Sequence, residues 1–181
     1  MAVLNSWTLV LGTLLATGAH AQALDEYQVK AAFLYNFVKF VEWPPHAFKS
    51  PPDQIAICIL GRDPFGGALD DAVNGKTFEG RTFVVPRISE VRQANGCQIL
   101  FLSASERKRM LAVIAEIKGV GVLTVGEMEG FAAQGGMINF RLEDGRVRLE
   151  VNVEAVERAN LRISSKLLSL AQIVKNRSAS R

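Results

Sequence analysis

Residues 97–125 read CQILFLSASERKRMLAVIAEIKGVGVLTV, and this stretch decides the fold. Apolar runs over 97–102 and 120–125 predict two strands, and the segment 103–119 between them predicts a helix. Two strands joined through a helix are typical of neighbouring parallel strands, because a parallel connection must cross over one face of the sheet. The predicted helix carries apolar side chains at helical spacing, namely Met110, Ile114 and Ile117.

Local signals predict the ends of this helix and the remaining elements. Ser103 and Glu106 have the spacing of a capping box, which predicts the helix start, and Gly119 predicts its end. Asp144-Gly145 predicts the turn of a hairpin. The other expected elements are a helix from near Asp25 to Trp43, a strand over 55–60, a short helix ending near Asn74, a strand over 82–85, hairpin strands over 137–142 and 147–153, and a terminal helix over 164–174.

Together these elements predict an α/β fold. We expect a single compact domain with a mostly parallel sheet, helices on both faces and a C-terminal antiparallel hairpin. The chain has 181 residues, of which 49% are hydrophobic and 22% charged, as in ordinary globular proteins. Its net charge of +3 is too small to indicate a nucleic-acid partner. Two histidines and two cysteines are too few for a Cys/His zinc site.

The first 21 residues have the composition of a secretory signal. They contain no Asp, Glu, Lys or Arg, and the apolar run Trp7–Leu15 is too short to cross a bilayer as a helix. Ala19-His20-Ala21 then supplies the small residues of a cleavage site. We therefore expect a signal peptide over 1–21, a domain over 22–181 and a periplasmic location. The alternative is an uncleaved membrane anchor.

Export changes how the cysteines are interpreted. Cys58 and Cys97 lie in or beside predicted strands that could be neighbours in one sheet. In an oxidising compartment an even number of cysteines favours a disulfide, and closing a loop of about 40 residues would stabilise the fold by roughly 4 kcal/mol in the chain-entropy account. Two buried free thiols are the alternative.

No arrangement typical of an enzyme is visible, and we expect no catalytic residue, metal or cofactor. The loop 61–67 joins a strand to a helix, but it lacks the Lys-Ser/Thr of a phosphate-binding loop. A receiver domain would need an acidic residue where the strand over 97–102 is followed by Ser103. After removal of the signal, His46 is the only histidine left in the sequence, and it lies in a proline-rich turn. A single histidine in such a turn argues against a hydrolase.

The helix expected over 25–43 is apolar on nearly all sides. Such a helix is either deeply buried or buried on one side and bound to a partner on the other. Both interpretations stay open. If the second is right, the aromatic residues that contact a partner are Phe37, Phe40 and Trp43.

The strand over 147–153 alternates apolar residues with Arg146, Arg148, Glu150 and Asn152. One interpretation is a polar face in contact with solvent. The other is a strip that binds a partner through Glu150 and Asn152, extended by Phe140 and Arg141 on the neighbouring strand. Both interpretations place these polar side chains on one face, because side chains alternate along a strand.

Four stretches together resemble the YfiR family of periplasmic proteins over roughly residues 25–174. They read VKAAFLYNFVKFVEWP, ICILGRDPFG, CQILFLS and GGMINFRLEDGRVRLEVNVEAVERANLRISSKLL, and they occur in the expected order. The resemblance implies a compact α/β domain without a catalytic cofactor. It also implies repression of an inner-membrane diguanylate cyclase, YfiN in the best-understood case, relieved when an outer-membrane lipoprotein sequesters the repressor.

The resemblance also bears on single residues. Cys58 and Cys97 match a disulfide pair of the family, whereas a second family pair has no counterpart here. Glu150 matches a position implicated in partner contact. We therefore expect a repressor of a membrane-bound diguanylate cyclase or sensor kinase, which controls cyclic di-GMP and biofilm formation. The alternative is a periplasmic small-ligand sensor or solute-binding module with a pocket after residues 58–60 or 123–125. A homodimer is a further open alternative.

Overall fold

The computed structural model describes residues 17–44, 47–48, 54–119 and 121–177. Residues 1–16 of the predicted signal peptide and His46 lie outside the described residues. The chain forms a mixed sheet of nine strands with the order β11-β9-β8-β7-β6-β2-β4-β3, in which β5 pairs with β2. The strands are β2 (Ile55–Leu60), β3 (Thr77–Phe78), β4 (Arg81–Val84), β5 (Arg87–Ile88), β6 (Ile99–Leu102), β7 (Leu123–Gly126), β8 (Ile138–Glu143), β9 (Arg146–Val151) and β11 (Ala171–Ile173).

The centre of the sheet is parallel, as the sequence predicts. Strands β4, β2, β6, β7 and β8 run in the same direction, and β8 and β9 form the antiparallel hairpin. At its turn Asp144 and Gly145 have φ values of 49° and 70°, as the Asp-Gly pair predicts. The α/β fold with a mostly parallel sheet and a C-terminal hairpin is therefore confirmed.

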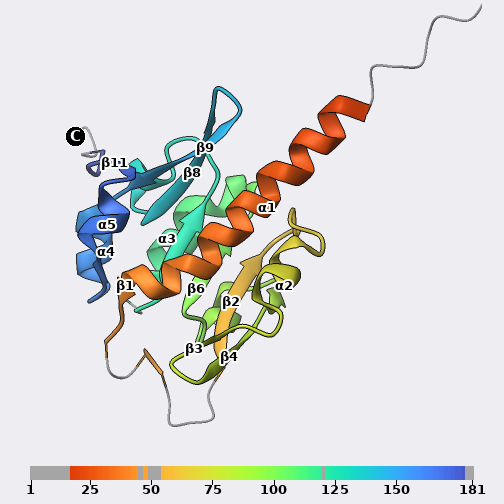
Figure 1. The fold of residues 1–181 in the computed structure, drawn as a ribbon. Helices are drawn as coiled ribbons and strands as arrows, with labels where there is room; N and C mark the ends of the chain where they lie inside the picture. The colour runs from red at the N-terminus through yellow and green to blue at the C-terminus, as the bar shows by residue number, and fades with distance from the viewer. Residues whose placement is uncertain (1–16, 45–46, 49–53, 120, 178–181) are drawn as a thin grey trace, which may run out of the picture.

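Helices cover both faces of this sheet (Figure 1). The long helix α1 crosses one face, and α3 lies on the opposite face. No helix in the described part of the chain is long and apolar enough to span a bilayer. The helices are α1 (Thr17–Phe40), α2 (Ala68–Val73), α3 (Met110–Ile117), α4 (Val153–Arg158) and α5 (Ser165–Leu168), with 3₁₀ turns at Val91–Ala94, Ala104–Arg109 and Ala132–Gln134.

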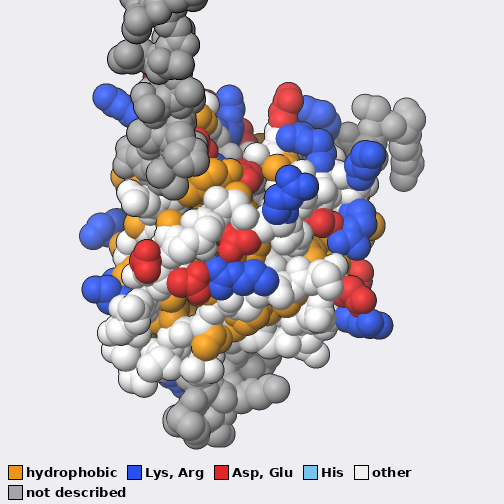
Figure 2. All heavy atoms as spheres, turned by 90° about the vertical axis from the view of Figure 1, so that its right-hand side faces the viewer, with side chains coloured by type: hydrophobic (Ala, Val, Ile, Leu, Met, Phe, Trp, Pro, Cys, Tyr) orange, Lys and Arg blue, Asp and Glu red, His pale blue; other side chains and the backbone are white. Residues whose placement is uncertain are grey.

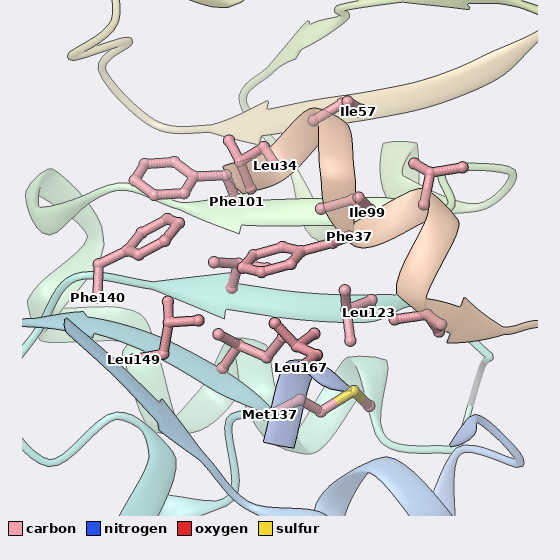
Figure 3. Packing of buried hydrophobic residues seen from close by; sticks show 14 of the residues in the cluster. Leu34, Phe37, Ile57, Ile99, Phe101, Leu123, Met137, Phe140, Leu149 and Leu167 are labelled. Carbon is pink, nitrogen blue, oxygen red and sulfur yellow. The ribbon is translucent and has the colours of Figure 1, made fainter. Parts of the chain in front are cut away.

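The core consists of two layers because the strands are apolar on both sides. Beneath α1, Leu34 and Phe37 pack on Ile57, Ile99 and other side chains from five strands (Figure 3). A second apolar cluster lies between the sheet and α3, and alternate residues of β2 and β6 contribute to it. Continuous apolar strands of this kind are typical of parallel sheets that are buried on both faces.

The disulfide between Cys58 and Cys97 lies in the layer beneath α3. Cys58 is on β2, Cys97 precedes β6, and their Cα atoms are 6.0 Å apart. The prediction of this bond is confirmed. It closes a loop across two neighbouring parallel strands, which pair at Cys58 and Leu100.

The C-terminal segment differs from its prediction. The helix expected over 164–174 is a single turn, α5, and Ala171–Ile173 instead form β11, which pairs in parallel with β9. The edge of β9 offers unpaired backbone groups, and pairing with β11 satisfies them. The tertiary contact therefore overrides the helical spacing of the leucines. A short helix, α4, which the sequence did not predict, lies between the two strands.

The two longer helices also differ from their predictions at their starts. Ser103 caps the turn over Ala104–Arg109 by accepting from the Ser105 backbone N–H, while Glu106 pairs with Arg109 instead of closing a capping box. The predicted capping box is therefore wrong, because the Arg109 side chain occupies the carboxylate. The helix α1 begins at Thr17 rather than near Asp25.

The end of α1 is also shifted. It ends at Phe40, because Val41 and Glu42 form β1, which pairs with β10 (Arg162–Ile163) in a separate two-stranded sheet. The predicted cleavage point after Ala21 falls within α1 and stays a prediction.

Candidate functional site

Glu150 on β9 is the predicted site residue with the most defined polar surroundings. Asn139 Nδ2 donates to Glu150 Oε2 at 3.0 Å, and Arg141 Nη1 donates to Oε1 at 3.0 Å. Asn139 lies directly opposite Glu150 in the β8–β9 ladder, so the hairpin register fixes this contact. The Glu150 side chain is 14% exposed. Its carboxylate is thus held in one position while it remains accessible from solvent.

Arg141 carries the positive charge of this arrangement. Its Nη2 atom lies 3.0 Å from Glu143 Oε1, so one guanidinium bridges Glu143 and Glu150. The hydrogen bond from Arg141 to Glu150 raises the pKa of Arg141, and the charges of Glu150, Glu143 and Glu129 raise it further. Arg141 therefore stays protonated under all ordinary conditions, and the carboxylates around it outnumber it.

A hollow of about 340 Å³ lies beside this pair, between the hairpin and the loop that follows β7. We call it the hairpin hollow. Its polar lining comes from Glu127, Glu129, Asn139, Arg141 and Glu150, so three carboxylates face one guanidinium. The hollow lies after β7, where the small-ligand alternative places a pocket, and that alternative stays a prediction. Ligands of α/β proteins commonly bind at the carboxyl ends of parallel strands, and β7 ends at this point.

A buried ion pair joins the loop that lines the hairpin hollow to α1. Lys30 on α1 lies 2.7 Å from Glu127 Oε2, and the two side chains are 5% and 8% exposed. Lys30 also pairs with Glu26, one helical turn earlier. Tyr27 donates from its hydroxyl to Glu127 Oε1 at 3.3 Å. Burial, together with the charges of Glu127 and Glu26, raises the pKa of Tyr27, so the phenol stays neutral and remains a donor.

Three predicted partner-binding residues lie in the interior. Phe37 and Phe140 are 0% and 2% exposed, and their rings stack with centroids 6.0 Å apart (Figure 3). Asn152 is also fully buried, where its side chain caps α4 by accepting from the Ala155 N–H at 3.0 Å. Phe37 and Asn152 present no surface to a partner, whereas Phe140, although it is only 2% exposed, is among the residues that line the hairpin hollow. All three stabilise the packing of α1, the hairpin and α4.

The other two aromatic candidates lie at and just after the C-terminal end of α1, and neither lines the hairpin hollow. Phe40 is half-buried with Lys166 Nζ 5.6 Å from its ring centroid. Trp43 is half-buried, packs on Phe48 and donates from Nε1 to the Val38 carbonyl at 3.4 Å. The structure therefore does not bring Phe40 and Trp43 together with Glu150. A single surface made of all six predicted residues does not form.

In the loop 61–67, considered above as an anion site, the acidic residue Asp63 bonds to other groups of the protein. Asp63 Oδ1 accepts from the Phe65 N–H at 2.7 Å, and Asp63 Oδ2 lies 2.9 Å from Arg87 Nε. Arg87 also donates from Nη1 to Asp70 Oδ1 at 2.9 Å. The described ranges hold no cluster of three or more His, Cys, Asp or Glu residues suited to a metal ion.

Figure 2 shows how charge is distributed on one face of the molecule. Acidic and basic side chains are interspersed there, with apolar side chains visible between them. A mixed surface of this kind is more typical of contact with proteins than of phosphate-rich partners, which select clustered Lys and Arg.

Sequence reasoning missed four residues of this site: Lys30, Glu127, Glu129 and Asn139. Two of them carry a signal that could have been used. Lys30 interrupts an otherwise apolar helix surface, and Glu127 directly follows the buried strand β7. A charged residue at either position needs a partner when it is buried. The pairing itself joins residues 97 positions apart and has no local signature.

Comparison with known sequences identifies one family. The sequence profile of the YfiR/HmsC-like family matches residues 27–172, which include all five described helices except the start of α1. No match was found among curated proteins.

Two solved structures share the fold at low sequence identity. A conserved domain protein from Vibrio cholerae O1 biovar El Tor has a TM-score of 0.56 and 9% identity, and the match covers 82% of this chain and 60% of that chain. The ABC domain in complex with L-Trp from Streptococcus pneumonia has a TM-score of 0.52 and 9% identity, with the same coverage. The chain thus spans about 60% of the length of each, and the likeness is one of fold.

Proposed function

Because the chain belongs to the YfiR/HmsC-like family, we propose that it is a repressor that holds a membrane-bound signalling enzyme inactive by protein–protein contact. Family membership supports the broader role of a periplasmic regulator of cyclic di-GMP signalling. The regulated enzyme is then a diguanylate cyclase, contacted through its periplasmic domain, and repression lowers cyclic di-GMP and biofilm formation. A sensor kinase is the other candidate for the regulated enzyme.

The position of Glu150 is the observation that supports a contact surface at the β8–β9 hairpin. Its carboxylate is held by Asn139 and Arg141 and stays 14% exposed at the rim of the hairpin hollow. On β8 the ladder places Leu142 opposite Val147 and Asn139 opposite Glu150, so the exposed Leu142 lies on the other face of the hairpin. The held, accessible carboxylate is therefore the feature that supports a contact surface here.

Release of the enzyme requires a competitor for the same surface. An outer-membrane lipoprotein that binds the hairpin would displace the enzyme, because one patch cannot hold two partners at once. Cys58 and Cys97 are 1% and 6% exposed, so in this proposal the disulfide stabilises the domain and does not itself contact the enzyme.

The test is capture from membranes with a tagged, processed protein, followed by mass spectrometry and by measurement of cyclic di-GMP in cells. Glu150→Lys is expected to lose the captured enzyme and to raise cyclic di-GMP. Glu116→Lys, an equal charge change at an exposed position of α3, is the matched control and should behave as the parent protein.

A parallel sample reduced and alkylated at Cys58 and Cys97 shows whether capture depends on the disulfide. Unchanged cyclic di-GMP in Glu150→Lys, with the variant folded, would exclude Glu150 from the repressing contact. Absence of any membrane enzyme from all samples would overturn the repressor itself.

A further inference from the structure

A second hollow, of about 350 Å³, is lined by residues of α3, of α4 and of the 3₁₀ turn at Ala132–Gln134. We call it the α3 pocket. Asn176 and Arg177, the last described residues of the chain, also line it, and it shares no lining residue with the hairpin hollow. Proteins bind small molecules in pockets of about 300–1,000 Å³. The α3 pocket is therefore large enough for a small ligand, and its lining indicates the class.

The charged side chains that line the α3 pocket are all cations. They are Lys118, which follows α3, Arg158 at the end of α4, and Arg177. Arg158 lies 3.9 Å from the exposed Glu154, whereas Lys118 and Arg177 form no ion pair within the described residues. The backbone N–H of Arg177 donates to the Ala133 carbonyl at 2.7 Å, which fixes this end of the chain beside the pocket. None of the described lining residues carries a carboxylate, so the lining attracts an anion.

A buried hydroxyl in the lining points to an acceptor on the ligand. Thr124 on β7 lines the α3 pocket and is 4% exposed. Its Oγ1 atom accepts from the Met137 N–H at 3.1 Å. Among the described residues this is the only hydrogen bond of the hydroxyl, so its hydrogen has no acceptor. Buried donors in proteins are normally satisfied, and an oxygen atom of a ligand would satisfy this one.

The apolar part of the lining is aliphatic. Leu111 and Ile114 lie on the same side of α3 as Lys118, because positions i, i+3 and i+7 share one face of a helix. Leu111 is 60% exposed, so this apolar strip reaches the solvent. From Leu111 to Lys118 the helix rises about 10 Å, which suits an extended hydrocarbon chain. No aromatic residue is among the described lining residues, so an aromatic ligand finds no ring to pack on.

We propose that the α3 pocket binds a medium-chain fatty acid. Its carboxylate accepts from the Thr124 hydroxyl and pairs with Lys118 and Arg177. Its aliphatic chain lies along α3 against Leu111 and Ile114. This inference goes beyond the proposed function and does not depend on it, because the α3 pocket is lined by other residues than the hairpin hollow.

The test titrates the ¹⁵N-labelled protein, with its disulfide intact, with octanoate. The backbone amides of Gly119 and Gly135, which both line the pocket, are followed by NMR. Saturable one-to-one shifts at both positions are the expected result. Octylammonium has the same chain with the opposite charge and should bind about tenfold more weakly or worse. 3-Phenylpropionate keeps the carboxylate but carries a ring, and it should bind about threefold more weakly or worse.

Two substitutions of Thr124 test the buried hydroxyl. Thr124→Val removes it at nearly constant volume and should weaken octanoate binding about threefold or more. Thr124→Ser keeps the hydroxyl and should bind within about twofold of the parent. The ¹⁵N spectrum shows whether Thr124→Val, which also loses the acceptor of the Met137 N–H, remains folded. Equal octanoate binding by the two folded variants would exclude the hydroxyl from the site and overturn the proposed placement of the carboxylate.

A double substitution tests the cations without touching the core. Lys118→Gln/Arg177→Gln should weaken octanoate binding about tenfold or more. The control, Arg62→Gln/Arg92→Gln, removes the same charge from exposed positions outside the lining and should leave binding unchanged. Equal weakening in both double variants would indicate general attraction of an anion to a basic protein and would overturn the site.

The remaining outcomes are equally decisive. Octylammonium that binds as tightly as octanoate, or 3-phenylpropionate that binds more tightly, overturns the fatty-acid assignment. Absence of a saturable octanoate shift overturns the pocket as a ligand site, whatever the capture from membranes shows. Octanoate binding as expected, without capture of a membrane enzyme, overturns the repressor function and leaves the α3 pocket in place.

Discussion

Lys30 on α1 and Glu127 at the end of β7 form an ion pair of 2.7 Å in which both side chains are more than nine-tenths buried. This pair joins the helix that covers one face of the sheet to the loop that lines the hairpin hollow. A buried charge depends on its partner more strongly than an exposed one, because the solvent that would stabilise it alone is excluded.

Lys30→Met should therefore lower the free energy of unfolding by about 3 kcal/mol, since it leaves Glu127 buried without a cation. Urea denaturation measures this loss. The double variant Lys30→Met/Glu127→Leu should recover part of the stability, because neither charge then remains. Arg158→Met, which breaks the looser, exposed pair with Glu154, is the control and should cost less than about 1 kcal/mol. Equal losses from Lys30→Met and Arg158→Met would contradict the assignment.

Removal of the disulfide should destabilise the domain without changing its fold. The bond joins residues 39 positions apart, for which the chain-entropy account gives about 4 kcal/mol. The double variant Cys58→Ala/Cys97→Ala should show this loss in a thermal or urea unfolding experiment under oxidising conditions. The parent protein in excess reductant should lose a similar amount, and a stability equal to that of the oxidised parent would contradict the expectation.

The loss of stability on acidification through pH 3.8 should depend on Arg87. Its hydrogen bond to Asp70 holds the pKa of that carboxyl below its ordinary value of 3.8. A carboxyl with a lowered pKa in the folded state stabilises the fold above 3.8, and this contribution is lost as the pH falls through the lowered value.

Arg87→Met should therefore be less stable than the parent at pH 7 and should show a shallower fall in stability on acidification. Unfolding by urea at a series of pH values from 7 to about 3 checks this. Arg92→Met removes a more exposed arginine paired with Glu90 and should leave the acid profile unchanged. Identical profiles for the parent and Arg87→Met would contradict the prediction.

Asn152 was predicted to contact a partner, but its surroundings indicate a structural role. It accepts from Ala155 N–H, and its Nδ2 atom donates to the Ala132 carbonyl and to Asn176 Oδ1 at 2.7 Å. Asn152→Ala should lower the free energy of unfolding by about 2 kcal/mol, because a helix cap and buried hydrogen bonds are lost together. Capture of the membrane enzyme by the folded variant should be unchanged. Loss of capture at unchanged stability would restore the predicted contact role.

The sequence predicts the centre of the fold well because the signals there are local. The apolar run of residues 55–60 is β2 residue for residue, and Asp144-Gly145 marks the hairpin turn. The C-terminal strand was not predictable in this way. Residues 171–173 adopt strand structure only because β9 offers an unpaired edge, and that edge lies in another part of the chain.

The candidate site was predictable only in part for the same reason. Glu150 follows from the alternation along its strand, and the cysteine pair follows from count and position. The contacts of Asn139 and Lys30 join distant parts of the chain and depend on the register of β8 with β9 and on the placement of α1. The burial of individual side chains was the property that the sequence predicted least well. Aromatic residues such as Phe37 and Phe140 are common in protein interfaces, yet these two stack on each other in the core.

The pairing of β11 with β9 has a consequence for truncated chains. β11 is the last strand of the sheet along the chain, and it begins twenty residues after β9 ends at Val151. Without residues 171–173 the outer side of β9 has no neighbour. A truncated or incompletely folded chain therefore presents an open strand to other polypeptides, and a chaperone that shields this edge would act on the folding protein but not on the finished one.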